Sequence, residues 1–73
     1  MEEIMRTNDI VALSFALSLL QDAGIETLVA DAHISVMEGS IGIFPRRLHV
    51  LTMDVEQARE ILEEAGLGSW LVT

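Results

Sequence analysis

The 73-residue chain contains no cysteine. It therefore has no disulfide framework, no thiolate nucleophile and none of the cysteine-based zinc motifs. A reducing cytoplasm fits this composition. The length allows one domain, over residues 1–73, with a thin core, because a chain this short buries only about 60% of the surface that it exposes when unfolded.

Lysine is also missing. Four arginines stand against twelve Asp and Glu residues, and the formal net charge is −8. Nucleic acid is therefore not expected as a partner, because affinity for a polyanion comes from many Lys and Arg contacts, and an anionic membrane surface is disfavoured for the same reason. The composition leaves room for one small anion at one local cluster, which is Arg46–Arg47.

No long hydrophobic run is present. The longest nearly apolar stretch, Ile10 to Leu20, is about half of the roughly 20 residues needed to cross a bilayer, and Ser14 and Ser18 interrupt it. The first residues, Met-Glu-Glu, carry negative charge where a secretory signal needs positive charge. We therefore expect a soluble, cytoplasmic protein with Met1 as its native initiator.

Two of the five glycines occupy the same place in an internal repeat. The segment LLQDAGI, from Leu19 to Ile25, returns as ILEEAGL, from Ile61 to Leu67. A glycine just past the last helical residue adopts the left-handed conformation, and the aliphatic residue after it packs back on the last turn. The repeat therefore predicts that Gly24 and Gly66 end two helices.

Polar residues upstream of each ending indicate where these helices begin. Thr7-Asn8-Asp9 offers side-chain oxygens to cap a first helix over about residues 9–23. Asp54, followed three residues later by Gln57, makes a capping-box-like start for a second helix over about residues 55–65.

Short β-type runs lie before and after the predicted helices. They are Glu3–Arg6, Ile25–Asp31, Arg47–Thr52 and, more weakly, Ser69–Val72. The resulting order is β-α-β, β-α-β. It predicts an α+β, ferredoxin-like fold, with a four-stranded antiparallel sheet and both helices on one face.

The two predicted helices differ in how their apolar residues are distributed. The second has one apolar stripe, as expected for a helix that lies on a sheet, whereas the first is apolar nearly all round. One small sheet cannot bury such a helix, so we predict a second protein surface, most simply a symmetric copy in a homo-oligomer (dimer or trimer), with Phe15 or Leu17 in the interface. The alternative is that the second helix and the crossing loop cover the excess.

The segment EGSIGIFPRR, from Glu38 to Arg47, concentrates unusual residues. It holds two of the five glycines, the only proline and two of the four positive charges. It overlaps the connection Ala32–Pro45, which is too long for the usual hairpin turn between the second and third strands. It is either a functional loop or a longer hairpin with its tip at Glu38-Gly39-Ser40.

The chemistry of this segment suggests an anion or partner site. The glycine-rich backbone could present N–H groups in a concave nest, and the two arginines could clamp a carboxylate or phosphate. The alternative is that the glycines shape a turn and the arginines pair with the chain's own carboxylates; adjacent strand residues also point to opposite faces, so Arg46 and Arg47 need not converge. The candidate residues are Gly39, Ser40, Gly42, Pro45, Arg46 and Arg47.

Four motifs together resemble a small bacterial signal-transducing family, a domain of unknown function. They are LLQDAGIE, GSIGIFP, RLHVLT and DVEQAREILEEAGL. The resemblance implies a fold similar to the nitrogen-regulatory PII (GlnB-like) proteins, in which the loop between strands two and three contacts partners and nucleotides bind between subunits. The chain lacks the length of PII and its lysine-bearing phosphate contacts, so the resemblance implies a fold and a regulatory role but no ligand.

Catalysis has little support in the sequence. The acid/base or metal-capable set is His33, His49, Asp31 and Glu38, and no activated nucleophile is visible. A solvated His33 and a strand-packed His49 explain the histidines without chemistry. We expect no catalytic residue, metal or cofactor.

We therefore predict a small cytoplasmic regulatory or interaction module in signal transduction, non-enzymatic, with a regulated protein or a small anion as a partner. The alternative is a sensor that binds an anionic metabolite or nucleotide at residues 38–47, and a small dimeric enzyme is a third possibility.

Overall fold

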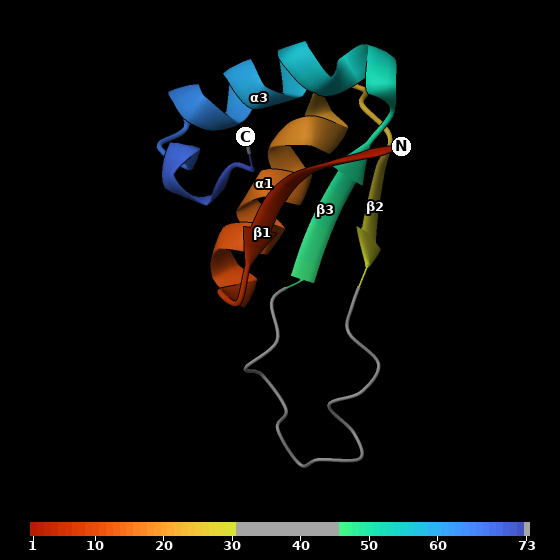
Figure 1. Ribbon diagram of the computed structural model, residues 1–73. Coiled ribbons are helices and arrows are strands. Elements are labelled where there is room, and N and C mark those ends of the chain that lie inside the picture. The colour runs from red at the N-terminus through yellow and green to blue at the C-terminus, as the bar shows by residue number, and fades with distance from the viewer. Residues whose placement is uncertain (31–45, 73) are drawn as a thin grey trace.

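The computed structural model describes residues 1–30 and 46–72 (Figure 1). In these residues the chain forms a small α+β arrangement of two α-helices and a three-stranded antiparallel sheet. The elements are β1 (Glu2–Thr7), α1 (Ile10–Asp22), β2 (Thr27–Ala30), β3 (Arg46–Val50) and α3 (Val55–Glu64), with short 3-10 turns η1 (Thr52–Asp54) and η2 (Gly68–Trp70). The predicted helices are confirmed, as are three of the four predicted strands.

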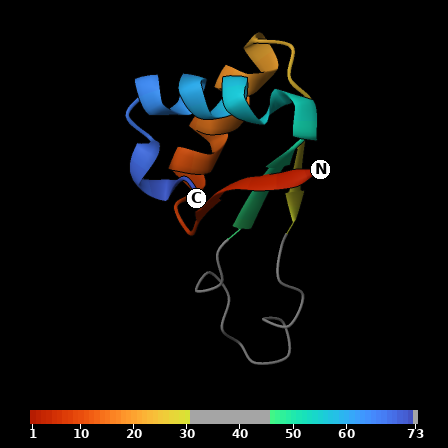
Figure 2. The same cartoon turned by 45° about the horizontal axis from the view of Figure 1, so that its top comes forward.

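The sheet has the strand order β1-β3-β2, with β3 antiparallel to both neighbours. Both helices pack on one face, and Figures 1 and 2 show α1 and α3 crossing each other on that side. No helix among the described residues covers the other face. We call that face the open sheet face.

The core lies between the sheet and the two helices. Its fully buried large side chains come from β1, α1, β3 and α3, and they are Ile4, Met5, Leu20, Leu48, Leu62 and Val50. Ala16 on α1 and Ala58 on α3 are also completely buried, and their small side chains let the helices approach the sheet and each other closely.

Both helices end as the repeat predicts. The N–H of Ile25 donates to the carbonyl of Leu20 at 2.9 Å, and the N–H of Gly24 donates to that of Gln21 at 3.0 Å. The same pair of bonds recurs from Leu67 and Gly66. The two glycines have φ of +77° and +86°, which is the left-handed conformation that this Schellman motif requires.

The two helix starts turned out differently. Asp9 caps α1 as predicted, because its Oδ1 accepts from the N–H groups of Val11 at 2.9 Å and Ala12 at 3.2 Å. The predicted capping box at Asp54 and Gln57 is wrong, since Asp54 makes no side-chain cap bond. Asp54 ends the turn η1 and already has helical backbone angles, whereas a capping residue is normally extended.

The predicted four-stranded sheet is also corrected. The described residues form three strands, and Ser69–Val72 is not a fourth. Gly68–Trp70 instead forms the turn η2, after which Leu71 makes one isolated antiparallel bridge to Met5 and the N–H of Val72 donates to the carbonyl of Ile4 at 2.9 Å. The chain end thus lies along β1 without a regular ladder. Among the described residues, no helix is long and apolar enough to span a membrane.

Candidate functional site

A β-bulge in β1 decides which side chains reach the open sheet face. The pairing register with β3 shifts between Glu3 and Met5, so that Ile4 is an extra residue in β1. Ile4 and Met5 both point into the core and are 1% and 0% exposed. Glu3 and Arg6, which would lie on opposite faces of a regular strand because they are three residues apart, now share the open sheet face.

Glu3 and Arg6 form a two-bond ion pair on this face. The Arg6 Nε donates to Oε2 of Glu3 at 2.7 Å, and the Arg6 Nη2 donates to Oε1 at 3.0 Å. The hydrogen bond from Arg6 lowers the pKa of the Glu3 carboxyl below its ordinary value, against a smaller opposing effect of burial. The charges of Arg6, Arg47 and His49 lower this pKa further.

Arg47 lies beside this ion pair on the central strand. It is the cross-strand partner of Arg6 on one side and of Ala30 on the other, and its side chain is exposed. It forms no hydrogen bond or ion pair with any part of the chain that the structure describes. Arg6 and Arg47 thus lie directly opposite each other on neighbouring strands, and the Glu3 carboxylate is paired with Arg6.

Arg46 takes the opposite direction from Arg47. Strand alternation places it on the helix-covered face, with the buried Leu48 and Val50, and it is half-buried opposite Thr7. The two adjacent arginines of the sequence therefore do not converge. The structure instead brings together Arg47 and Arg6, from two different strands.

His49 and Leu28 complete the open sheet face. They are cross-strand partners, and His49 is also the partner of Glu3. The His49 ring is half-buried, and its Nδ1 is inaccessible to solvent with no hydrogen-bond partner among the described residues. Leu28 is 53% exposed, so it adds a large apolar side chain to this face.

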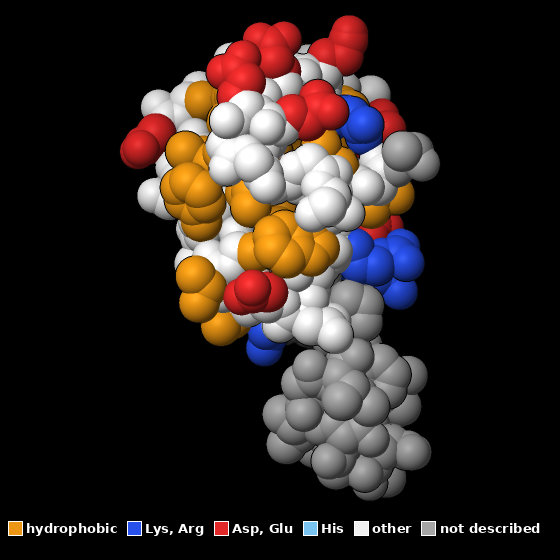
Figure 3. Space-filling model, turned by 90° about the vertical axis from the view of Figure 1, so that its left-hand side faces the viewer, with side chains coloured by type: hydrophobic (Ala, Val, Ile, Leu, Met, Phe, Trp, Pro, Cys, Tyr) orange, Lys and Arg blue, Asp and Glu red, His pale blue; other side chains and the backbone are white. Residues whose placement is uncertain are grey.

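A second surface is formed by the outward side of α1. Ile10, Val11 and Phe15 are 53%, 73% and 47% exposed, and we call these three residues the α1 patch. Of the two predicted interface residues, Phe15 belongs to the patch, whereas Leu17 is half-buried and packs against the core. Figure 3 shows hydrophobic side chains, drawn orange, at the left and in the centre of this view, and arginines, drawn blue, at the right and at the lower edge.

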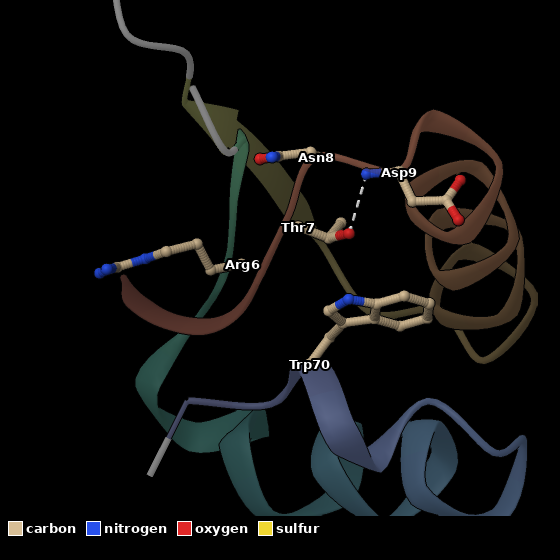
Figure 4. A pocket seen from close by; sticks show the side chains of 5 residues that line it. All are labelled: Arg6, Thr7, Asn8, Asp9 and Trp70. Atoms are coloured by element: carbon tan, nitrogen blue, oxygen red, sulfur yellow. Dashed lines mark hydrogen bonds between the residues drawn. The ribbon is translucent and has the colours of Figure 1, made fainter. Parts of the chain in front are cut away.

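A shallow cavity of about 380 Å³ opens at the start of α1, lined by Arg6, Thr7, Asn8, Asp9 and Trp70. Figure 4 shows the Trp70 indole beneath Thr7 and Asp9, with the side chains of Arg6 and Asn8 pointing away. The Thr7 hydroxyl accepts from the Asp9 N–H at 2.9 Å, and the Asp9 carboxylate caps the helix. Two of the polar groups that line the cavity, those of Thr7 and Asp9, thus hold the beginning of α1.

The remaining sequence candidates lie outside the described residues. These are Gly39, Ser40, Gly42 and Pro45, together with Asp31, His33 and Glu38. Within residues 1–30 and 46–72, no three His, Asp or Glu side chains gather as a metal ion would require. His49 lies on the open sheet face, apart from any such group.

The comparisons with known proteins identify the family. Residues 1–66 match the model of a family described as "Putative prokaryotic signal transducing protein". The chain belongs to this family. The match includes β1, both helices and the whole three-stranded sheet, so the open sheet face and the α1 patch both lie within the family domain. A comparison with curated proteins found no match.

Sequence reasoning missed Arg6 and Leu28 on the open sheet face and Trp70 at the cavity. Arg6 and Leu28 were not candidates, because neither stands in a motif and the bulge that brings Arg6 to the open sheet face leaves no sequence signature. Trp70 was missed because a single tryptophan near a chain end carries no spacing information. One sequence signal could have pointed to Arg6. The chain has only four positively charged residues, so each arginine is a candidate for binding an anion.

Proposed function

We propose that the protein is a small, non-enzymatic interaction module of the cytoplasm that acts in signal transduction as a homo-oligomer joined through the α1 patch. The description of its family supports the signalling role. The observation that carries the interaction role is the α1 patch itself. An isolated exposed apolar residue is ordinary, whereas three large exposed apolar side chains on one short helix leave apolar surface in water that a partner could cover.

The proposed architecture behind this role is the ferredoxin-like, PII-like fold. Its support is the strand order β1-β3-β2 with two helices on one face, and the chain end that lies along the free edge of β1 at Leu71. A fully formed strand at that edge would complete the four-stranded order of this fold.

The test is the molecular mass of the unmodified chain across a range of concentrations. Sedimentation velocity is expected to show a dimer or trimer at high micromolar concentration that dissociates on dilution. A monomer throughout that range would refute the homo-oligomer and leave the α1 patch without its proposed partner.

A second candidate function is a sensor of a small anionic metabolite or nucleotide at residues 38–47. The observation that favours it is Arg47, which is exposed and unpaired within the described residues. A thermal-shift screen of nucleotides and anionic metabolites tests it, because a ligand at 100-fold over its Kd adds about 2.7 kcal/mol to the free energy of unfolding. If no compound raises Tm, the interaction module remains.

A further inference from the structure

We propose that the open sheet face is a second binding surface, separate from the α1 patch, and that it takes a glutamate-rich segment of a partner protein with Arg47 and Arg6 as its anchors. The inference goes beyond self-association, because it concerns the opposite layer of the molecule and a different kind of partner. The observation that carries it is the like-charged pair of exposed arginines opposite each other on β1 and β3.

The donors of these two side chains are only partly used. Glu3 occupies one edge of the Arg6 guanidinium, through Nε and Nη2, which leaves its Nη1 free to donate elsewhere. The whole fork of Arg47 is available among the described residues. A carboxylate bound by Arg47 would also lie near Arg6, because the two residues are cross-strand partners, and both could donate charge-assisted hydrogen bonds to it.

Charge complementarity selects the partner. Arg59 donates to the carbonyl of Val72 at 2.5 Å, and Arg46 lies on the other face of the sheet, so the positive charge available on the open sheet face comes from Arg6 and Arg47. The chain as a whole carries −8. A large polyanion would be repelled by the rest of the surface, whereas a short acidic segment interacts mainly within a Debye length of about 8 Å.

The shape of the site favours a polypeptide over a small metabolite. The cavity identified in the described part of the chain opens at Trp70 and contains the side chains that hold α1, whereas the arginine pair lies on an exposed strand surface. Leu28, 53% exposed, lies beside His49 on the same face. A segment that carries glutamates next to an aliphatic residue would pair with the arginines and cover Leu28 together.

The experiment is a titration of the 15N-labelled full chain, followed by amide chemical shifts. The probe is a short synthetic peptide with the repeating pattern Glu-Glu-Leu, and its control is the matching Gln-Gln-Leu peptide. We expect the acidic peptide to shift the amides of β1 and β3 around Arg6 and Arg47, to leave those of the α1 patch unchanged, and to bind more weakly as salt is raised.

Arg46 provides a matched control within the same strand. Arg47→Gln is expected to weaken binding about tenfold or more, because it removes charge-assisted hydrogen bonds, and Arg47→Lys is expected to weaken it less, because it keeps the charge without the fork. Arg46 lies on the other face, so Arg46→Gln should change the affinity for the peptide by no more than about twofold from that of the wild type, as expected for a site independent of the binding surface. Phe15→Glu should bind the peptide normally, which separates this surface from the self-association surface.

Four outcomes would overturn the proposal. They are the absence of shifts with the acidic peptide, equal binding of the glutamine peptide, equal losses from Arg46→Gln and Arg47→Gln, and an arginine-dependent response to inorganic phosphate at lower concentration than to the peptide. The last would make the face a small-anion site. Dispersed spectra of each variant check that it remains folded.

Discussion

The proposed self-association through α1 can be tested at Phe15. The side chain is 47% exposed, and an aromatic side chain offers about 200 Å² in all, so about 100 Å² remains to be buried in each copy. At about 25 cal/mol per Å², this area contributes about 2.5 kcal/mol per copy, and about 5 kcal/mol to a symmetric dimer. Phe15→Glu should therefore raise the dissociation constant by about three to four orders of magnitude, before any cost of burying the new carboxylate.

Two companion variants separate lost association from lost folding. Val11→Glu removes another residue of the α1 patch that is 73% exposed and so packs little against its own chain, and the new carboxylate in the first turn is favoured by the helix dipole. Gln57→Glu adds the same charge on the exposed side of α3, away from the patch. Sedimentation velocity should show that Phe15→Glu and Val11→Glu are monomers and that Gln57→Glu associates like the wild type. Circular dichroism checks that each variant is folded. If all the variants associate like the wild type, α1 is not the interface.

Three further predictions concern the fold and the ion pair. Gly66→Ala should lower the free energy of unfolding by about 1 kcal/mol, or Tm by about 4–8 °C, because φ is +86° there. Gly68→Ala should be neutral or slightly stabilising, because its new Cβ would meet Glu63 Cγ at an ordinary 3.7 Å. Equal effects of the two variants in thermal melts would contradict the left-handed cap. Asp9→Ala should lower the free energy of unfolding, measured in urea titrations, by about 1 kcal/mol, and Asp54→Ala should lower it much less, because of these two only Asp9 caps a helix through its side chain. A larger loss from Asp54→Ala would indicate that the predicted capping box does form. The Glu3 carboxyl, titrated by NMR, should have a pKa below 4.5, and Arg6→Gln should raise this pKa. Because the pKa is lowered in the folded state, the stability that the pair contributes is present above pH 4.5 and is lost as the pH falls through the folded-state pKa; an unchanged pKa in Arg6→Gln would contradict the pairing.

The sequence predicted the parts of the fold that local chemistry determines. The two Ala-Gly-aliphatic endings became Schellman motifs because three consecutive residues are enough to specify that geometry. The start at Asp54 failed because a 3-10 turn, Thr52–Asp54, precedes α3 and leaves Asp54 with helical backbone angles. The fourth strand failed for a similar reason: Gly68–Trp70 forms a 3-10 turn within the predicted strand, and Leu71 after it makes only an isolated bridge to Met5.

The candidate surfaces were predicted to a lesser extent. The excess apolar surface of the first helix was readable from composition, and Phe15 followed from it, but periodicity alone did not separate Phe15 from Leu17 on a helix that is apolar nearly all round. The arginine pair of the sequence, Arg46–Arg47, is divided between two faces. The two arginines that the structure brings together are Arg6 and Arg47. Their proximity depends on the register between β1 and β3, which a single sequence does not reveal.

The bulge in β1 explains why the open sheet face has its charges. A regular strand over Glu3-Ile-Met-Arg6 would place Ile4 with Arg6 on one face and Glu3 with Met5 on the other. Either register would then expose a large apolar side chain or bury a charged one, and burying an unpaired charge costs several kcal/mol. One extra residue resolves the conflict, because Ile4 and Met5 both enter the core, where each contributes about 1.5–3 kcal/mol, and both charged residues remain in solvent. Hydrophobic burial alone is therefore enough to bring Arg6 beside Glu3 and opposite Arg47, so the proposed acidic-partner surface needs no feature of the chain beyond those that stabilise its core.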